Sequence, residues 1–243
     1  MTKDEKVEIY RLLKTASDGI YGFSSPDFPG EIPVFEDDGP QADISFSQPD
    51  PTLETIASKI ASCSRCPLSN TRHNVVPGEG PSNPFVMVIG EGPGEEEDKS
   101  GRPFVGPAGQ LLDKMLSAIQ LSRNSNTFIA NIVKCRPPMN RNPESNEAEA
   151  CRSFLDAQIA ALKPKAILAA GSVAIKNLLK SQDGVMKLHG KILEYRGIPL
   201  MTTFHPSALL RAPENKRIAW EDLKAFKRKL LEINPSYDQG FKG

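Results

Sequence analysis

Apolar and polar residues alternate along this chain in a way that is typical of an α/β protein. Short, nearly continuous apolar runs, as expected for strands buried on both faces, are separated by longer stretches of helical character. The expected strands are 85–90, 127–134, 165–170 and 198–204, with a weaker hairpin at 191–200. The expected helices are 107–120, 146–162, 171–180 and 216–233, after a first one that leads into Cys63. This order predicts a three-layer α/β/α sandwich around a central, mostly parallel four-stranded sheet.

The beginning of the chain differs from the rest. Residues 4–17 have the composition of a short helix, and residues 18–51 mix six prolines with Asp, Glu, Gly and Ser, so we expect no packed core there. We therefore expect a leader over 1–54, made of a short helix and a linker, and a domain over 55–243. The leader is either a dispensable tail or a tether that binds a partner protein.

Charge changes this picture, because the leader has 12 acidic and four basic residues, a net −8. The whole chain has zero net charge, so residues 55–243 carry +8, which is compatible with binding phosphates. No apolar stretch approaches the roughly 20 residues of a membrane span, and no signal for secretion is evident. We expect a cytoplasmic, bacterial-type intracellular protein, nucleoid-associated if it binds DNA, with a monomer as the default.

Four cysteines bracket the unusual motifs: a close pair, Cys63 and Cys66, and two distant residues, Cys135 and Cys151. Without an export signal, four cysteines indicate a metal or catalysis more than a disulfide framework. Four thiolates suit a structural zinc or an iron–sulfur cluster. Structural zinc sites mostly use two close pairs, so this spacing favours a [4Fe–4S] cluster, with zinc second and redox disulfides third.

Unusual sequences follow the expected strands, where the sites of parallel sheets form. GEGPGEEED (90–98) and GRPFVGPAGQLL (101–112) follow the first strand, Asn131 lies in the second, and HPSALLR (205–211) follows the last. Taken singly, Phe104 reads as a core residue, Asn131 as a turn cap and His205 as a loop histidine. Their joint occurrence at strand ends favours a functional site.

These motifs, with NIVKCRPPMNRNP and the four cysteines, closely resemble those of the family 4 uracil-DNA glycosylases, the iron–sulfur members of the uracil glycosylase superfamily. The resemblance covers about residues 55–233. It implies a monofunctional enzyme that hydrolyses the N-glycosidic bond of uracil in single- or double-stranded DNA, and so starts base excision repair. It also implies a [4Fe–4S] cluster on the four cysteines.

The resemblance assigns roles around a flipped-out base. Phe104 would stack on uracil, Asn131 would donate to O4 and accept from N3–H, and the Glu91–Gly92 backbone would close the pocket around O2. His205 would donate to O2 as negative charge gathers on the leaving base. Better-known uracil glycosylases place an Asp where this chain has Gly92, so Glu97, helped by Glu91 or Asn131, is expected to orient the water or to screen the sugar cation. Glu97 could instead block the 5-methyl group of thymine.

The segment 205–217 resembles the loop that enters the minor groove. Leu209 is predicted as the wedge that fills the vacated stack, with Leu210 as its alternative. Ser207, Arg211 and Lys216 would contact phosphates. The rival interpretations are a catalytically silent nucleic-acid-binding module of a repair or replication complex and a zinc hydrolase. The zinc hydrolase would need an open ligand position, which four cysteines do not leave.

Overall fold

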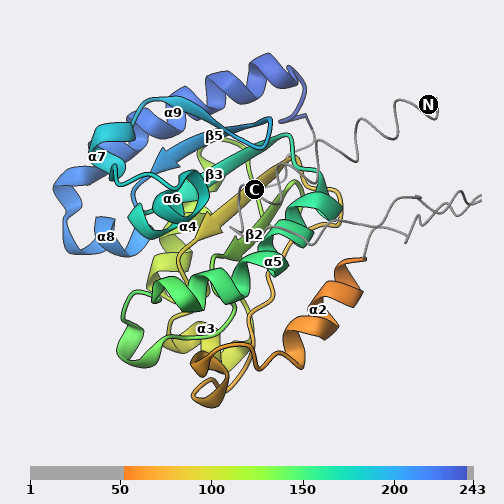
Figure 1. Cartoon of the computed structure of the whole chain (residues 1–243). Helices are drawn as coiled ribbons and strands as arrows, with labels where there is room; N and C mark the ends of the chain where they lie inside the picture. The colour runs from red at the N-terminus through yellow and green to blue at the C-terminus, as the bar shows by residue number, and fades with distance from the viewer. Residues whose placement is uncertain (1–51, 240–243) are drawn as a thin grey trace, which may run out of the picture. The chain divides into compact units, whose positions relative to one another are not determined.

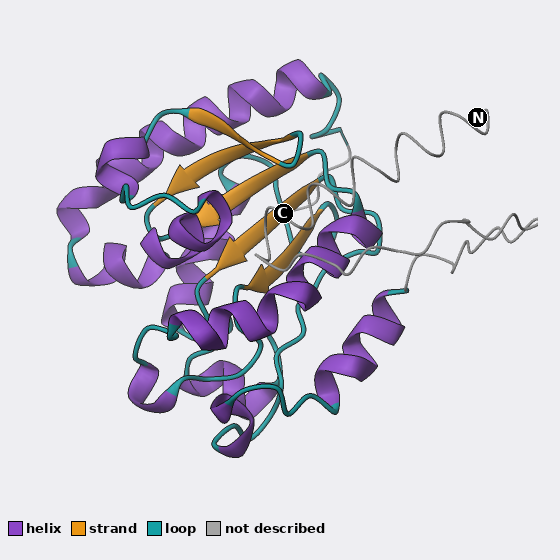
Figure 2. Cartoon of the chain, in the orientation of Figure 1, coloured by secondary structure: helices purple, strands orange, loops and turns teal. Residues whose placement is uncertain are grey.

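A computed structural model describes residues 52–239, and Figures 1 and 2 show its arrangement. The predictions for residues 1–51 lie outside the described residues. No helix in the described part of the chain is long and apolar enough to cross a bilayer.

A twisted five-stranded sheet in the order β2-β1-β3-β5-β4 forms the middle layer (Figure 2). Four of its strands are parallel: β1 (Val86–Gly90), β2 (Thr127–Asn131), β3 (Ala166–Ala170) and β5 (Ile198–Thr203). Every residue of the first three is buried, which explains their mostly apolar sequence. The predicted sandwich is confirmed.

The sheet has one strand more than the four predicted. β4 (Ile192–Tyr195) pairs antiparallel with β5, and Tyr195 faces Ile198 across a two-residue turn. Both turn residues, Arg196 and Gly197, have positive φ, at 52° and 78°, which suits a tight hairpin turn. The hairpin expected from the sequence therefore adds β4 to the sheet as an antiparallel edge strand.

Helices cover both faces of the sheet. The α-helices are α2 (Leu53–Ala61), α3 (Glu95–Ser100), α4 (Pro107–Ser117), α5 (Ser145–Leu162), α6 (Ser172–Leu179), α7 (Val185–Leu188), α8 (Pro206–Arg211) and α9 (Lys216–Ile233). Short 3-10 helices are η1 (Pro67–Asn70), η2 (Pro138–Asn140) and η3 (Pro213–Asn215). In Figure 1, α5 and α6 lie on one face, and α4 and α9 lie on the other. The four parallel strands end at one edge, where the unusual loops meet.

Candidate active site

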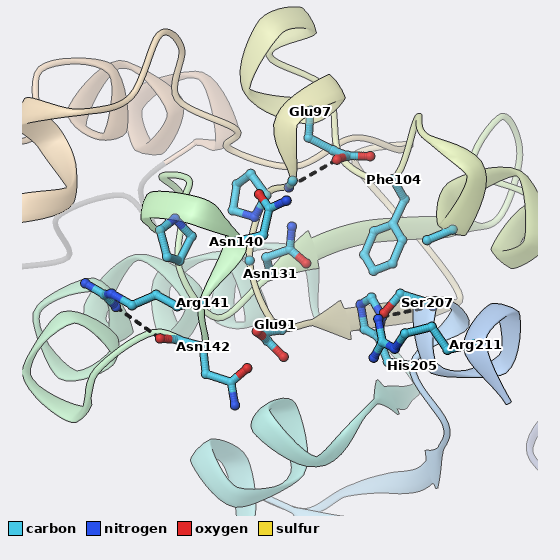
Figure 3. A pocket seen from close by; sticks show the side chains of 15 residues that line it. Glu91, Glu97, Phe104, Asn131, Asn140, Arg141, Asn142, His205, Ser207 and Arg211 are labelled. Carbon is cyan, nitrogen blue, oxygen red and sulfur yellow. Dashed lines mark hydrogen bonds between the residues drawn. The ribbon is translucent and has the colours of Figure 1, made fainter.

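A cavity of about 290 Å³ opens at the carboxyl ends of the strands (Figure 3). Its walls come from the loop after β1, the Phe104 loop, the end of β2, the segment after Cys135 and the start of α8. The structure therefore brings most of the predicted site residues to one place: Glu91, Gly92, Glu97, Phe104, Asn131, His205, Ser207 and Arg211. Lys216 is not among the lining residues and begins α9 instead.

Asn131 presents an unpaired acceptor at this cavity. It is the last residue of β2, is 1% exposed, and lies in register with Gly90 of β1. Its Oδ1 atom is buried and has no hydrogen-bond partner in the described part of the chain. A Cβ atom at Gly90 would lie 2.5 Å from both this oxygen and the Phe104 ring. A buried acceptor without a partner is costly, so the site suits a ligand that donates a hydrogen bond there.

Phe104 is held in an uncommon backbone conformation. Its φ is 52°, and its side chain is 5% exposed. The Arg123 guanidinium donates to the backbone oxygens of Pro103 and Phe104 over 2.7 and 2.8 Å. Arg123 also pairs with Asp113, at 2.9 Å. These contacts fix the ring against the cavity. Arg123 was missed in the sequence because its partners lie about 20 residues upstream and no local pattern marks it.

Gly109 lets helix α4 approach this loop. A Cβ atom at Gly109 would lie 1.9 Å from the Phe104 carbonyl oxygen, a backbone atom that cannot move without the ring. We expect Gly109→Ala to lower kcat/KM for the reaction at this cavity about 10- to 100-fold and to destabilise the fold by about 1–3 kcal/mol.

Gly184→Ala is the matched control, because a Cβ atom there would meet only Ser172 Oγ, at 3.7 Å. Steady-state kinetics and thermal unfolding of both variants measure the difference. Equal kinetics in the two variants would show that the Phe104 loop does not depend on Gly109.

His205 is a partly buried, neutral imidazole. It caps α8, and its Nδ1 atom accepts a hydrogen bond from the Ser207 backbone N–H at 3.2 Å, with Ser207 Oγ at 2.8 Å. Burial, with a smaller effect of Arg211, lowers the pKa of His205 to about 4. Because Nδ1 accepts, the ring proton lies on Nε2. The ring centre lies 5.5 Å from that of Phe104 (Figure 3).

Two carboxylates line the cavity and differ in their partners. Glu97 Oε1 accepts from the N–H groups of Val105 and Gly106 at 2.8 and 2.9 Å, and its Oε2 accepts from Gly94 at 3.1 Å. Glu97 thus ties together the two loops that follow β1. The Glu91 carboxylate accepts no hydrogen bond from the described residues, although its backbone oxygen accepts one from Val133. Burial raises the pKa of this carboxyl group, against the effect of Arg211. The predicted role of Glu97 at the water stays a prediction.

The two leucines of α8 that were considered for the wedge differ in their exposure. Leu209 is 1% exposed, whereas Leu210 is 44% exposed. In this structure Leu209 lies in the core and Leu210 is the side chain available at the surface. The predicted role of Leu209 as the wedge stays a prediction. Burial of Leu209 follows from its contact with the apolar side of α4 and α9, where it shares a cavity with Met115 and Leu223.

The four cysteines line a second, small cavity between α2, η1 and α5. None forms a disulfide. Arg72 donates to Cys135 Sγ over 3.1 Å, and burial raises the pKa of the Cys151 thiol to about 11. Within residues 52–239, no three His, Cys, Asp or Glu side chains converge on a single metal ion. Four thiols around one cavity are the set of donors that a structural zinc ion or an iron–sulfur cluster takes.

Comparison with known proteins agrees with this geometry. The family model for the uracil DNA glycosylase superfamily matches residues 77–224. A type-4 uracil-DNA glycosylase of Sulfurisphaera tokodaii is 41% identical over 76% of this chain and 86% of its own length. One of Thermotoga maritima is 42% identical over 72% of this chain and 93% of its own. A type-5 uracil-DNA glycosylase of Pyrobaculum aerophilum is 29% identical over 64% of this chain and 83% of its own length. The chain therefore belongs to the uracil-DNA glycosylase superfamily and, within it, to the type-4 family.

Proposed function

We propose that this protein hydrolyses the N-glycosidic bond of uracil in DNA. The observation that carries the proposal is the pairing of two groups at one cavity: the unpartnered Oδ1 of Asn131 and a neutral imidazole at His205 whose proton is on Nε2. Phe104 supplies an apolar ring beside both. The similarity to proteins named type-4 uracil-DNA glycosylases supports the same reaction.

Asn131 selects the base. Its Oδ1 accepts from N3–H of uracil, and its Nδ2 donates to O4. Cytosine has an acceptor at N3 and a donor at C4, so the same amide meets two mismatched groups. A good bidentate contact of this kind contributes roughly 1–3 kcal/mol of discrimination. The ring of Phe104 stacks on the base and replaces the neighbours that it leaves in the DNA.

His205 stabilises the leaving base. As the bond between N1 and C1′ of the sugar lengthens, negative charge gathers on uracil O2, and Nε2–H donates to that oxygen. A neutral donor fixed by Ser207 needs no reorganisation during the reaction, and one such donor contributes about 2.7–4 kcal/mol. Water then attacks the sugar cation at C1′. Two carboxylates orient this water. One is that of Glu91, which accepts no hydrogen bond from the described residues, and the other is that of Glu97, which also holds the loops.

DNA is held by α8 and the start of α9. Arg211 and Ser207 line the cavity, and Lys216 begins α9. Their positive charges and hydroxyl group support a role in binding phosphates. Leu210 is the exposed apolar side chain of this segment. It fills the space that the flipped nucleotide leaves.

The two adjacent leucines give a matched pair of variants. We expect Leu210→Ala to reduce uracil release from duplex DNA about tenfold, with little effect on single-stranded DNA or on stability, because the wedge matters only where a stack must be opened. Leu209→Ala should instead cost about 2–5 kcal/mol of stability, because it empties a buried position. Kinetics on both substrates and thermal unfolding distinguish the two. A duplex-specific loss in Leu209→Ala alone would reverse the assignment.

The cysteine cavity is proposed to hold a [4Fe–4S] cluster on Cys63, Cys66, Cys135 and Cys151. The cluster would act structurally, by tying α2 to the segment after Cys135 that forms one wall of the active-site cavity. Protein purified without oxygen should contain about four irons and four sulfides per chain. One zinc per chain without sulfide would favour the structural zinc site instead.

The function is tested with a labelled oligonucleotide that contains one uracil, as a single strand and in U·G and U·A duplexes. Cleavage at the uracil only after alkali treatment shows base release without strand cleavage. Binding of these oligonucleotides without any release, by protein with its full metal content, would identify the chain as a silent nucleic-acid-binding module.

A further inference from the structure

Lys134 is a buried amine that the reaction above does not use. Its side chain is 1% exposed. Nζ donates to the backbone oxygen of Asn131 over 2.9 Å and to Gln158 Oε1 over 2.7 Å, and Gln158 Nε2 donates in turn to the Pro77 carbonyl. The side chain thus reaches back to the end of β2, where the recognition asparagine lies.

The same residue lines the cysteine cavity. Lys134 is among the residues around the four thiols, and it is close enough to the Cys151 sulfur to interact with it electrostatically. The two oxygens that accept from Nζ are both neutral. An ammonium group taken out of water needs an anionic neighbour, and among the described residues the charged group that acts on Lys134 is the Cys151 thiol and not a carboxylate. The negative charge of metal-bound thiolates would supply one.

We propose that Lys134 is a positioning residue that links the cysteine site to uracil recognition. Its ammonium group balances the negative charge of the cluster, and its hydrogen bond fixes the backbone carbonyl of Asn131. The orientation of the Asn131 amide in the active-site cavity then depends on the state of the cysteine cavity. This inference rests on the proposed cofactor.

The test uses Lys134→Met, which keeps the length of the side chain but removes its charge and donors. Lys59→Met, on the exposed side of the neighbouring helix α2, is the control for loss of one positive charge. We expect Lys134→Met to lose its visible cluster absorption at least about tenfold faster in chelator than the control does, as for other groups that support metal ligands.

The second readout is recognition without turnover. Affinity is measured for DNA that carries 2′-fluoro-deoxyuridine, a nucleotide that resists hydrolysis, and for the same DNA with thymidine. Lys134→Met is expected to reduce the ratio of the two affinities about tenfold. The proposed role of Lys134 is refuted if the variant keeps the wild-type cluster lifetime or the wild-type ratio of affinities for the two DNAs. This holds whatever the thermal stability of the variant.

If Lys134→Met does not fold, the proposal is tested by amide hydrogen exchange of the wild-type protein with and without its cluster. Removal of the cluster should speed amide exchange in residues 129–134 more than in 166–170 of β3. Equal changes in both segments would contradict the proposal. If the wild-type protein contains no iron and sulfide, the proposed cofactor is wrong. If it contains the cluster but Lys134→Met changes neither the cluster lifetime nor the affinity ratio, only the proposed role of Lys134 is wrong.

Discussion

Replacement of His205 by alanine is expected to lower kcat for uracil release about 100- to 1000-fold, with a much smaller change in KM. The imidazole acts on charge that develops only as the bond to the base breaks, so its loss affects the transition state more than the bound substrate. Single-turnover rates on a U·G duplex measure the change. His189→Ala is the control, because that ring is 42% exposed and lies outside the cavity.

The pH dependence of stability should identify the same ring. Burial lowers the pKa of His205 to about 4 in the folded protein, below its ordinary value of 6.5. The unfolded chain therefore binds more protons between these values, so the stability that the neutral ring contributes is complete above pH 6.5 and is lost as the pH falls towards 4. Thermal unfolding of His205→Ala should depend less on pH in this window. Identical profiles for the two proteins would show that His205 is not buried as a neutral ring.

Replacement of Asn131 by aspartate is expected to reduce kcat/KM for uracil about 10- to 100-fold. The carboxylate keeps an acceptor for N3–H but has no donor for O4, and it places a charge where Asn131 is 1% exposed. Asn124→Asp, at an exposed position before β2, carries the same change of side chain outside the cavity.

Rates at saturating and at low substrate, together with thermal unfolding, separate lost recognition from lost folding. A near-normal kcat/KM in Asn131→Asp, with the control also normal, would remove Asn131 from base recognition.

The sequence predicted the layers of the fold better than the ends of its elements. The run 127–134 was expected to be one strand, but β2 ends at Asn131. Ile132 and Val133 remain buried beyond that end, so apolar character continues after the strand pairing stops. The weak hairpin signal likewise did not reveal that β4 joins the sheet, because β4 is an edge strand and only one of its four residues is buried.

The site was predicted where its residues form contiguous motifs, and was missed where they act across the fold. Phe104 and His205 stand out in unusual local sequences. Arg123 does not, because its role comes from contacts with backbone atoms of a distant loop. The exposure of Leu209 and Leu210 depends on how α8 packs on α4 and α9, and adjacent leucines carry no signal of that packing. The unpaired oxygen of Asn131 and the tautomer of His205 are likewise properties of the assembled cavity.

The central claim is that a neutral His205, with its proton on Nε2, and Asn131 act together on one uracil. Nitrogen-15 NMR tests it directly, because the chain has only three histidines. At pH 7, His205 should show a protonated Nε2 and an unprotonated Nδ1. The Nε2 signal and the Asn131 side-chain amide should both shift with DNA that carries 2′-fluoro-deoxyuridine, and not with the matched thymidine DNA. A protonated His205, or shifts that do not distinguish the two DNAs, would contradict the account.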